Sequence, residues 1–220
     1  MHYISDVVGL SASLALLGAY HAYLRYRLRK NPGYTVQRLN DVVRAAWVNE
    51  IMQRREGVLA VQTLRNSMMA AVFLASTAVL MIIGVLTLSE QGDKLRTTWQ
   101  ALDVFGADSP RLWLIKMLLL LIDLLVAFFS FATAIRLFHH VGYMINAPQG
   151  EFLTGADPAH VSTHLNRAGG FYSIGMRAYY YTVPLLLWLF GPAFMLAGTV
   201  ALVVALYYLD RSPRVSLSKS

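Results

Sequence analysis

Four long apolar segments dominate the chain, and each is near the ~20 residues that a helix needs to cross a bilayer. They cover residues 4–24, 67–88, 112–138 and 179–209. The last is long, is interrupted by Pro184 and Gly191-Pro192, and has tyrosines at both ends, as at membrane interfaces. The pattern predicts one four-span membrane domain over residues 1–211, with a kink near Gly191 and a flexible tail at 212–220.

The polar connections contain two shorter amphipathic patterns. Apolar residues recur at helical spacing in the first connection, at Val36, Leu39, Val43 and Trp47. In the second, Asp157-Pro158 is typical of a helix start, followed by an apolar face of Val161, Leu165 and Ala168. We predict an all-α integral membrane four-helix bundle, with these short helices lying against the inner leaflet in two cytoplasmic loops.

Composition and charge agree with a membrane protein. Of 220 residues, 56% are hydrophobic and only 14% are charged, against about 25% in soluble domains. The net charge is +7, but the basic residues cluster beside the apolar segments, so anionic lipid explains them better than nucleic acid does. Nine Lys and Arg lie in 25–65 and three in 136–177, against four in 94–116 and three after residue 210. This bias predicts an inner-membrane protein with both termini on the non-cytoplasmic side.

The basic cluster at Arg25, Arg27, Arg29 and Lys30 follows the first apolar segment and does not precede it. A cleaved signal peptide has the reverse order, so we expect an uncleaved membrane anchor.

Four sequence blocks resemble a known family. They are LAVQTLRN at 59–66, FSFATAIRLFHHVGYMINAP at 129–148, GMRAYYYTVPLLLWLFGP at 175–192 and ALYYLD at 205–210. Together they resemble family 599 of the domains of unknown function, which are multipass membrane proteins of bacteria and plants. The resemblance covers the chain from Tyr20-His21 to Asp210 in the same order. It implies a four-span membrane protein and implies no activity.

Polar residues gather where the predicted spans meet the cytoplasm. Gln62, Arg65 and Asn66 open the second span, Arg136 closes the third, and Arg177 opens the fourth. One interpretation is that the arginines snorkel to lipid phosphates. The other is a pocket for a small anion or a lipid headgroup, with Glu50 and Glu56 as the nearest acids. Our leading hypothesis is a non-enzymatic protein that binds such a ligand or supports a membrane complex.

The third span carries an intramembrane polar stripe. Lys116, Asp123 and Ser130 recur at seven-residue steps, which places them on one helical face. A carboxylate near mid-span is costly unless it is bonded or faces a cavity. Asp123 is therefore either structural or the centre of an oligomeric ion or proton channel or a small-solute transporter. Lys116 lies about 10 Å along the axis, too far for a tight pair.

Histidines raise a cofactor alternative. His21 could face His139 or His140 across the bundle and ligate the iron of a b-type haem, or these residues could simply lie at the membrane interface. His160 and His164 have the spacing of a helical metal pair, but Val161 stands where the metalloprotease motif needs glutamate. No cofactor is predicted beyond these alternatives.

Small residues form a ladder on the last span, at Ala193, Ala197, Ala201 and Ala205. Such a ladder lets another helix approach closely, either within the bundle or on a second copy. We therefore expect membrane lipids, and a homo-oligomer or a membrane complex, as partners. The sequence contains no nucleophile elbow, phosphate-binding loop or nucleic-acid module, so no catalytic residues are predicted.

Overall fold

The computed structural model describes residues 2–31, 33–90, 110–147 and 157–211, and six helices make up most of them. The helices are α1 (His2–Lys30), α2 (Val36–Arg54), α3 (Gly57–Glu90), α5 (Pro110–Met144), α6 (Pro158–Leu187) and α7 (Pro192–Leu209). The predicted all-α class is confirmed. The predicted tail at 212–220 lies outside the described residues.

Side-chain caps fix where two of the helices begin. The Thr35 hydroxyl accepts a hydrogen bond from the Arg38 backbone N–H at the start of α2. A carboxylate oxygen of Asp157 accepts from the His160 N–H at 2.8 Å, with Pro158 at the first position of α6. Both caps satisfy N–H groups that have no partner within the helix.

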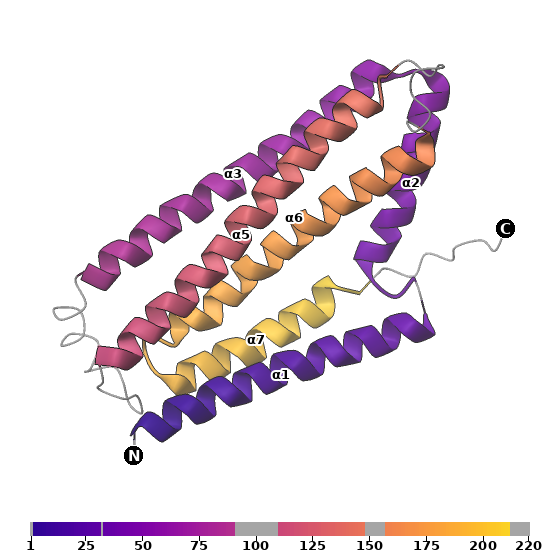
Figure 1. The fold of residues 1–220 in the computed structure, drawn as a ribbon. Coiled ribbons are helices and arrows are strands. Elements are labelled where there is room, and N and C mark those ends of the chain that lie inside the picture. Colours follow the sequence, from indigo (N-terminus) through magenta and orange to yellow (C-terminus); the bar gives the residue numbers. More distant parts are fainter. Residues whose placement is uncertain (1, 32, 91–109, 148–156, 212–220) are drawn as a thin grey trace.

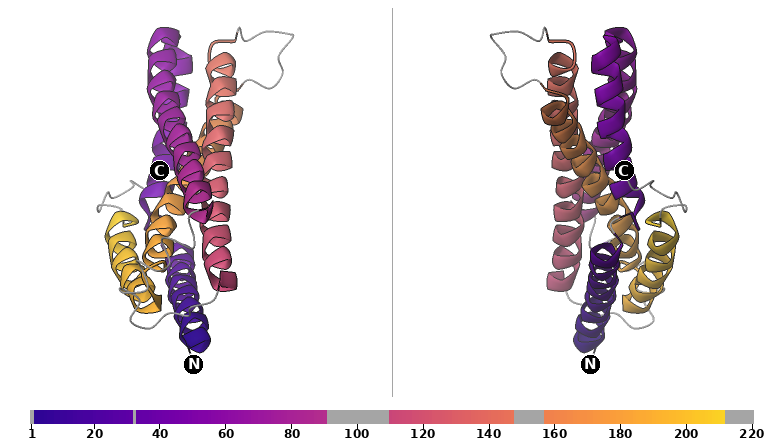
Figure 2. Two further views of the ribbon diagram at one scale, coloured as in Figure 1. Left: turned by 90° about the vertical axis from the view of Figure 1, so that its left-hand side faces the viewer. Right: turned by 90° about the vertical axis from the view of Figure 1, so that its right-hand side faces the viewer.

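Five helices form a row in the order α3, α5, α6, α7 and α1, and α2 packs across one end on α6 (Figures 1 and 2). Four of them are long and apolar enough to cross a membrane: Ile4–Lys30, Gly57–Glu90, Arg111–Met144 and Pro192–Leu209. Large apolar side chains such as Phe73 and Leu80 are 72% and 69% exposed on the outside of the bundle. Such exposure is expected of a surface that contacts lipid.

The predicted fourth span at 179–209 is not one helix. α6 ends at Leu187, and α7 begins at Pro192 and runs back along α6 (Figure 1). Gly191 has φ of 138°, which L-residues rarely adopt, and Pro192 is preset for the first turn of a new helix. The predicted kink is therefore a complete reversal, and α6 and α7 form a helical hairpin.

This reversal places the start of α1 and the end of α7 at opposite ends of the bundle. Trp188, in the α6–α7 turn, donates from its indole nitrogen to Asp6 near the start of α1. At the other end, the backbone N–H of Val36 donates to the carbonyl oxygen of Asp210, just after α7. We call these the Asp6 end and the α2 end. The prediction that both termini lie on one side depends on 179–209 being a single span. Because this segment forms two antiparallel helices, the helix directions do not support that prediction.

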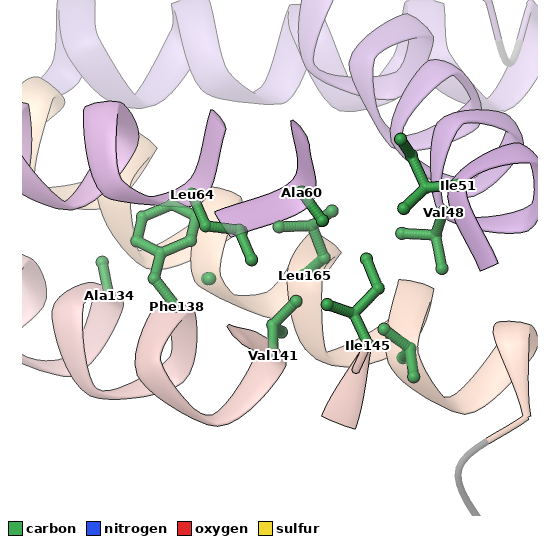
Figure 3. Packing of buried hydrophobic residues seen from close by; sticks show 11 residues of the cluster. Val48, Ile51, Ala60, Leu64, Ala134, Phe138, Val141, Ile145 and Leu165 are labelled. Atoms are coloured by element: carbon green, nitrogen blue, oxygen red, sulfur yellow. The ribbon is translucent and has the colours of Figure 1, made fainter. Parts of the chain in front are cut away.

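The two predicted interfacial helices are part of a packed extension at the α2 end. α2 packs on α6 and buries Val48 and Ile51, whereas Val43 is 55% exposed. The predicted second short helix is the first half of α6, and its expected face is buried, at Val161, Leu165 and Ala168. These residues share one apolar cluster with α3 and α5 (Figure 3).

The extension follows from helix length. α3 has 34 residues and α5 has 35. At 1.5 Å per residue each is about 50 Å long, against ~30 Å of hydrocarbon. The parts of α3 and α5 that exceed the hydrocarbon thickness pack with the first half of α6 at the α2 end. Their apolar side chains are buried there in part by α2.

Candidate ligand site

A polar network joins α1, α6 and the end of α7 at the α2 end of the bundle. Arg177 donates to a carboxylate oxygen of Asp210 at 2.8 Å and contacts Nε2 of His21 at 3.2 Å. The hydroxyl of Tyr20 donates to the other oxygen of Asp210 at 2.7 Å. The hydroxyl of Tyr181 lies 3.0 Å from Nε2 of His21. We call Tyr20, His21, Arg177, Tyr181 and Asp210 the Arg177 network.

The bonds of His21 define its tautomer. Nδ1 lies 2.8 Å from the carbonyl oxygen of Leu17, which can only accept, so Nδ1 carries the proton. Nε2 then accepts from Arg177 and Tyr181. Both ring nitrogens are engaged within the protein.

The haem alternative requires His21 to face His139 or His140. Both of those histidines are exposed on α5, whereas α1 packs on α7 and the ring of His21 is bonded to α6 residues. The structure does not bring the proposed axial ligands together. Among the described residues there is also no group of three or more His, Cys, Asp or Glu that could hold a metal ion.

A cavity of about 860 Å³ lies beside the Arg177 network, between α2, α3, α6 and α7. Its volume is in the range of small-molecule sites. Apolar side chains form one part of its lining, including Val43, Trp47, Ala70, Met176 and Leu206. Polar side chains form the other part, including Asn40, Arg44, Asn66, Ser173, Arg177 and Asp210. The cavity can therefore offer both hydrogen bonds and apolar contacts to one bound molecule.

Both arginines of the cavity are compensated. Arg44 donates to a carboxylate oxygen of Asp41 at 2.7 Å and to the side-chain oxygen of Asn166 at 2.9 Å. Arg177 is paired with Asp210. The cavity thus offers hydrogen-bonding groups without an excess of positive charge, which is unlike a site built for a small anion.

The structure separates the predicted inner-face cluster into parts. Asn66 and Arg177 line the cavity. Gln62 and Arg65 are exposed on α3 and do not line it. Arg136 lines a different cleft, on the other face of the α5–α6 pair.

The acid of this site is neither of the two that the sequence pattern indicates. Glu50 is paired with Arg54, one turn along α2, at 2.5 Å. Asp210 is the acid that bonds Arg177. A single span over 179–209 would place Asp210 at the opposite end of the bundle from Arg177, whereas the α6–α7 hairpin brings the two together. In the sequence, Asp210 is marked only as the last residue of the ALYYLD block.

The three residues of the predicted intramembrane polar stripe also lie in different environments. Lys116 lies 3.4 Å from a carboxylate oxygen of Asp6, and its ammonium group donates to the backbone oxygen of Trp188 at 2.9 Å. The Trp188 indole N–H donates to the same Asp6 oxygen at 2.8 Å. Asp6 is 0% exposed and Lys116 is 5% exposed. We call these three residues the Lys116 clamp.

Asp123 is not part of this clamp. It accepts a hydrogen bond from the hydroxyl of Thr182 on α6 at 2.8 Å. Ser130 is buried one step further along α5 and lines a separate groove. The prediction that Lys116 does not pair tightly with Asp123 agrees with these contacts.

The alanine ladder of α7 faces away from the bundle. Ala193, Ala197, Ala201 and Ala205 are all exposed, whereas Met195, Gly198, Thr199 and Leu206 are buried against the neighbouring helices. Within the described part of the chain the ladder therefore has no close helix partner. Association with a second copy or another membrane protein stays a prediction.

The row of long apolar helices, the lipid-facing side chains and the polar ends define a polytopic helical membrane protein. The chain belongs to the family of proteins of unknown function DUF599, whose sequence profile matches residues 8–215. No curated protein and no solved structure matches it.

Proposed function

We propose that this protein binds the headgroup region of a membrane lipid in the cavity between α2, α3, α6 and α7, without performing chemistry on it. The observation that carries this proposal is the cavity's lining, which combines apolar side chains with charge-compensated polar groups. Paired arginines favour a zwitterionic or uncharged headgroup over a small free anion, since an added negative charge would compete with Asp41 and Asp210.

The helix directions and the positive charges support one orientation of the cavity in the membrane. α5 and α7 run in the same direction, so α6 must return across the membrane between them, giving five crossings. With five crossings, fifteen of the 19 Lys and Arg lie at the α2 end, in 25–65, 136–177 and after residue 210. The positive-inside rule then makes the α2 end cytoplasmic, at the inner face of a cell membrane. The N-terminus is outside and the C-terminus is inside.

A reporter that is active only in the cytoplasm tests this orientation. Fused after Ser220 it should be active, and fused within 91–109 it should be inactive. The reverse pattern, or an inactive reporter at the C-terminus, would contradict the five-crossing arrangement.

The cavity is tested by filling it. Ala70 lines the cavity on α3, and Ser76 is exposed on the same helix outside it. We expect Ala70→Trp to lower the retention of added dioleoylphosphatidylethanolamine in native mass spectrometry, and Ser76→Trp to leave it unchanged. Equal retention by both variants would remove the cavity as the lipid site. Displacement of the lipid by millimolar inorganic phosphate would instead favour the small-anion hypothesis.

A further inference from the structure

A second cleft lies on the opposite face of the α5–α6 pair and has a different charge. Arg136 and His140, one turn apart on α5, meet His164 and Arg167 of α6 around a cleft of about 340 Å³. Residues four apart, or three apart, share a face of a helix, so two antiparallel helices bring four basic side chains together. The sequence pattern alone did not associate these four residues.

The arginines of this cleft have no acidic partner among the described residues. Within the described part of the chain, neither Arg136 nor Arg167 makes an ion pair or a side-chain hydrogen bond, and no described acidic residue lines the cleft. Arg44 and Arg177 on the other face are both paired. A free pair of guanidinium groups attracts an anion that can accept several hydrogen bonds.

His164 reports the same positive environment. Its Nδ1 is buried and makes no hydrogen bond in the described residues. Burial lowers the pKa of His164, and the neighbouring His160, Arg167 and His140 lower it further. An anion in the cleft would offset this repulsion and could accept a hydrogen bond from the imidazole ring.

An apolar groove continues the cleft toward the Asp6 end. It has a volume of about 350 Å³ and shares Thr133 and Phe171 with the basic cleft. Its other lining residues are Ile122, Leu125, Val126, Phe129 and Ser130. From Thr133 to Ile122 the groove follows α5 for about 16 Å. That length is about half of the ~30 Å hydrocarbon layer, which is the depth of one leaflet.

We propose that this face of α5 and α6 binds an anionic glycerophospholipid of the inner leaflet. Its phosphate lies between Arg136 and Arg167, and one acyl chain lies in the groove over Val126 and Phe129. The guanidinium groups match the geometry of phosphate oxygens, and the groove accounts for a chain that a free phosphate lacks. This site goes beyond the proposed function, because it lies on another face and selects a charged lipid.

Native mass spectrometry of the full-length protein in detergent tests the headgroup. The probes are dioleoylphosphatidic acid and dioleoylphosphatidylcholine, which have the same chains. We expect the wild type to retain phosphatidic acid preferentially, and Arg136→Gln/Arg167→Gln to weaken its binding roughly tenfold or more. Arg25→Gln/Arg65→Gln removes the same charge from exposed positions outside the cleft and should have no effect. Equal retention of the two lipids, or wild-type affinity in the cleft variant, would overturn the proposal.

Chain length separates a lipid from a free phosphate. Val126→Trp should fill the groove and weaken dioleoylphosphatidic acid more than dihexanoylphosphatidic acid. Val72→Trp, an exposed position on α3, is the matched control and should change neither. If both chain lengths bind the wild type equally, and inorganic phosphate displaces them, the site is one for soluble phosphate and the lipid proposal fails. Because Ala70→Trp does not touch this groove, either proposal can fail without the other.

Discussion

The two ends of the bundle are both held by ion pairs, yet the pairs differ in their exposure to solvent. In the Lys116 clamp the side chains of Lys116 and Asp6 are 5% and 0% exposed. In the Arg177 network the side chains of Arg177 and Asp210 are 24% and 18% exposed, and both line the large cavity. The clamp is a buried connection between α1, α5 and the α6–α7 turn, while the network is partly exposed.

This difference in burial favours a structural role for the Lys116 clamp and a binding role for the Arg177 network. A buried charge needs its partner, because the cost of leaving it alone inside the protein is several kcal/mol. A partly exposed pair can exchange its partner for water or for a ligand at smaller cost. The Asp6 end is therefore expected to be rigid, and the α2 end is where the protein can adapt to a bound molecule.

Breaking the clamp should have the largest effect on stability. Lys116→Met removes the cation that lies 3.4 Å from the buried carboxylate of Asp6. We expect a loss of about 3–5 kcal/mol in the free energy of unfolding, measured by denaturant titration in detergent. The double variant Asp6→Asn/Lys116→Met should recover much of this loss. A single variant as stable as the wild type would show that the clamp is not what holds this end.

The second-largest effect on stability is expected at a close helix contact near the Lys116 clamp. A Cβ atom at Gly9 would lie 2.8 Å from Cβ of Pro192, at the α1–α7 interface. Gly9→Ala should therefore destabilise the protein by about 1–3 kcal/mol. Gly18 on the same helix has nothing within 4 Å of such an atom. Gly18→Ala should be neutral or raise stability by up to about 1 kcal/mol, since alanine is the better helix former. Equal melting temperatures for the two variants would contradict this contact.

Breaking the Arg177 network should lower the free energy of unfolding less than Lys116→Met or Gly9→Ala does. Arg177→Gln removes the pair with Asp210, but the side chains are partly exposed, so we expect a loss of about 1 kcal/mol. A double-mutant cycle with Asp210→Asn measures the coupling directly, and Arg65→Gln is an exposed control on α3. A coupling several times larger would mean that the α2 end is as rigid as the Asp6 end, and the contrast between them would disappear.

The smallest effect on stability is expected at Asp123. In Asp123→Asn the side-chain oxygen can still accept from the Thr182 hydroxyl, which also lies 3.2 Å from the Ala178 carbonyl oxygen. The melting temperature should shift by an amount that corresponds to less than about 1 kcal/mol. Proton flux in liposomes is measured on the same variant. Loss of a wild-type flux at unchanged stability would establish the transport hypothesis, whereas a clear loss of stability alone would make Asp123 structural.

The first three apolar segments were predictable because a continuous apolar run longer than 20 residues has few alternatives. The fourth was not, because a Gly-Pro interruption within an apolar segment does not reveal whether Gly191 kinks a helix or reverses it. That depends on the φ of Gly191 and on the packing of Gly198 against Pro184 and Leu187, which the sequence does not contain.

The polar contacts were also only partly predictable from the sequence. The depth of Arg177 and His21 was predictable from their positions in the spans, and the two residues do meet. Their acid, Asp210, was misplaced together with the hairpin. Asp6 and Lys116 are 110 positions apart in the sequence, and no local pattern connects a carboxylate in the first helix with an amine in α5.

The pairing of α1 with α7 also constrains how the protein is made. Of the described helices α1 is synthesised first and α7 last, yet they pack along each other, with Gly9 against Pro192 and Tyr20 bonded to Asp210. During synthesis α1 must therefore stay in the bilayer without its contacts to α7, and the carboxylate of Asp6 without Lys116 and Trp188, until those later segments have been inserted. Among the described helices, the last packing step therefore joins the helix that was made first to the helix that was made last.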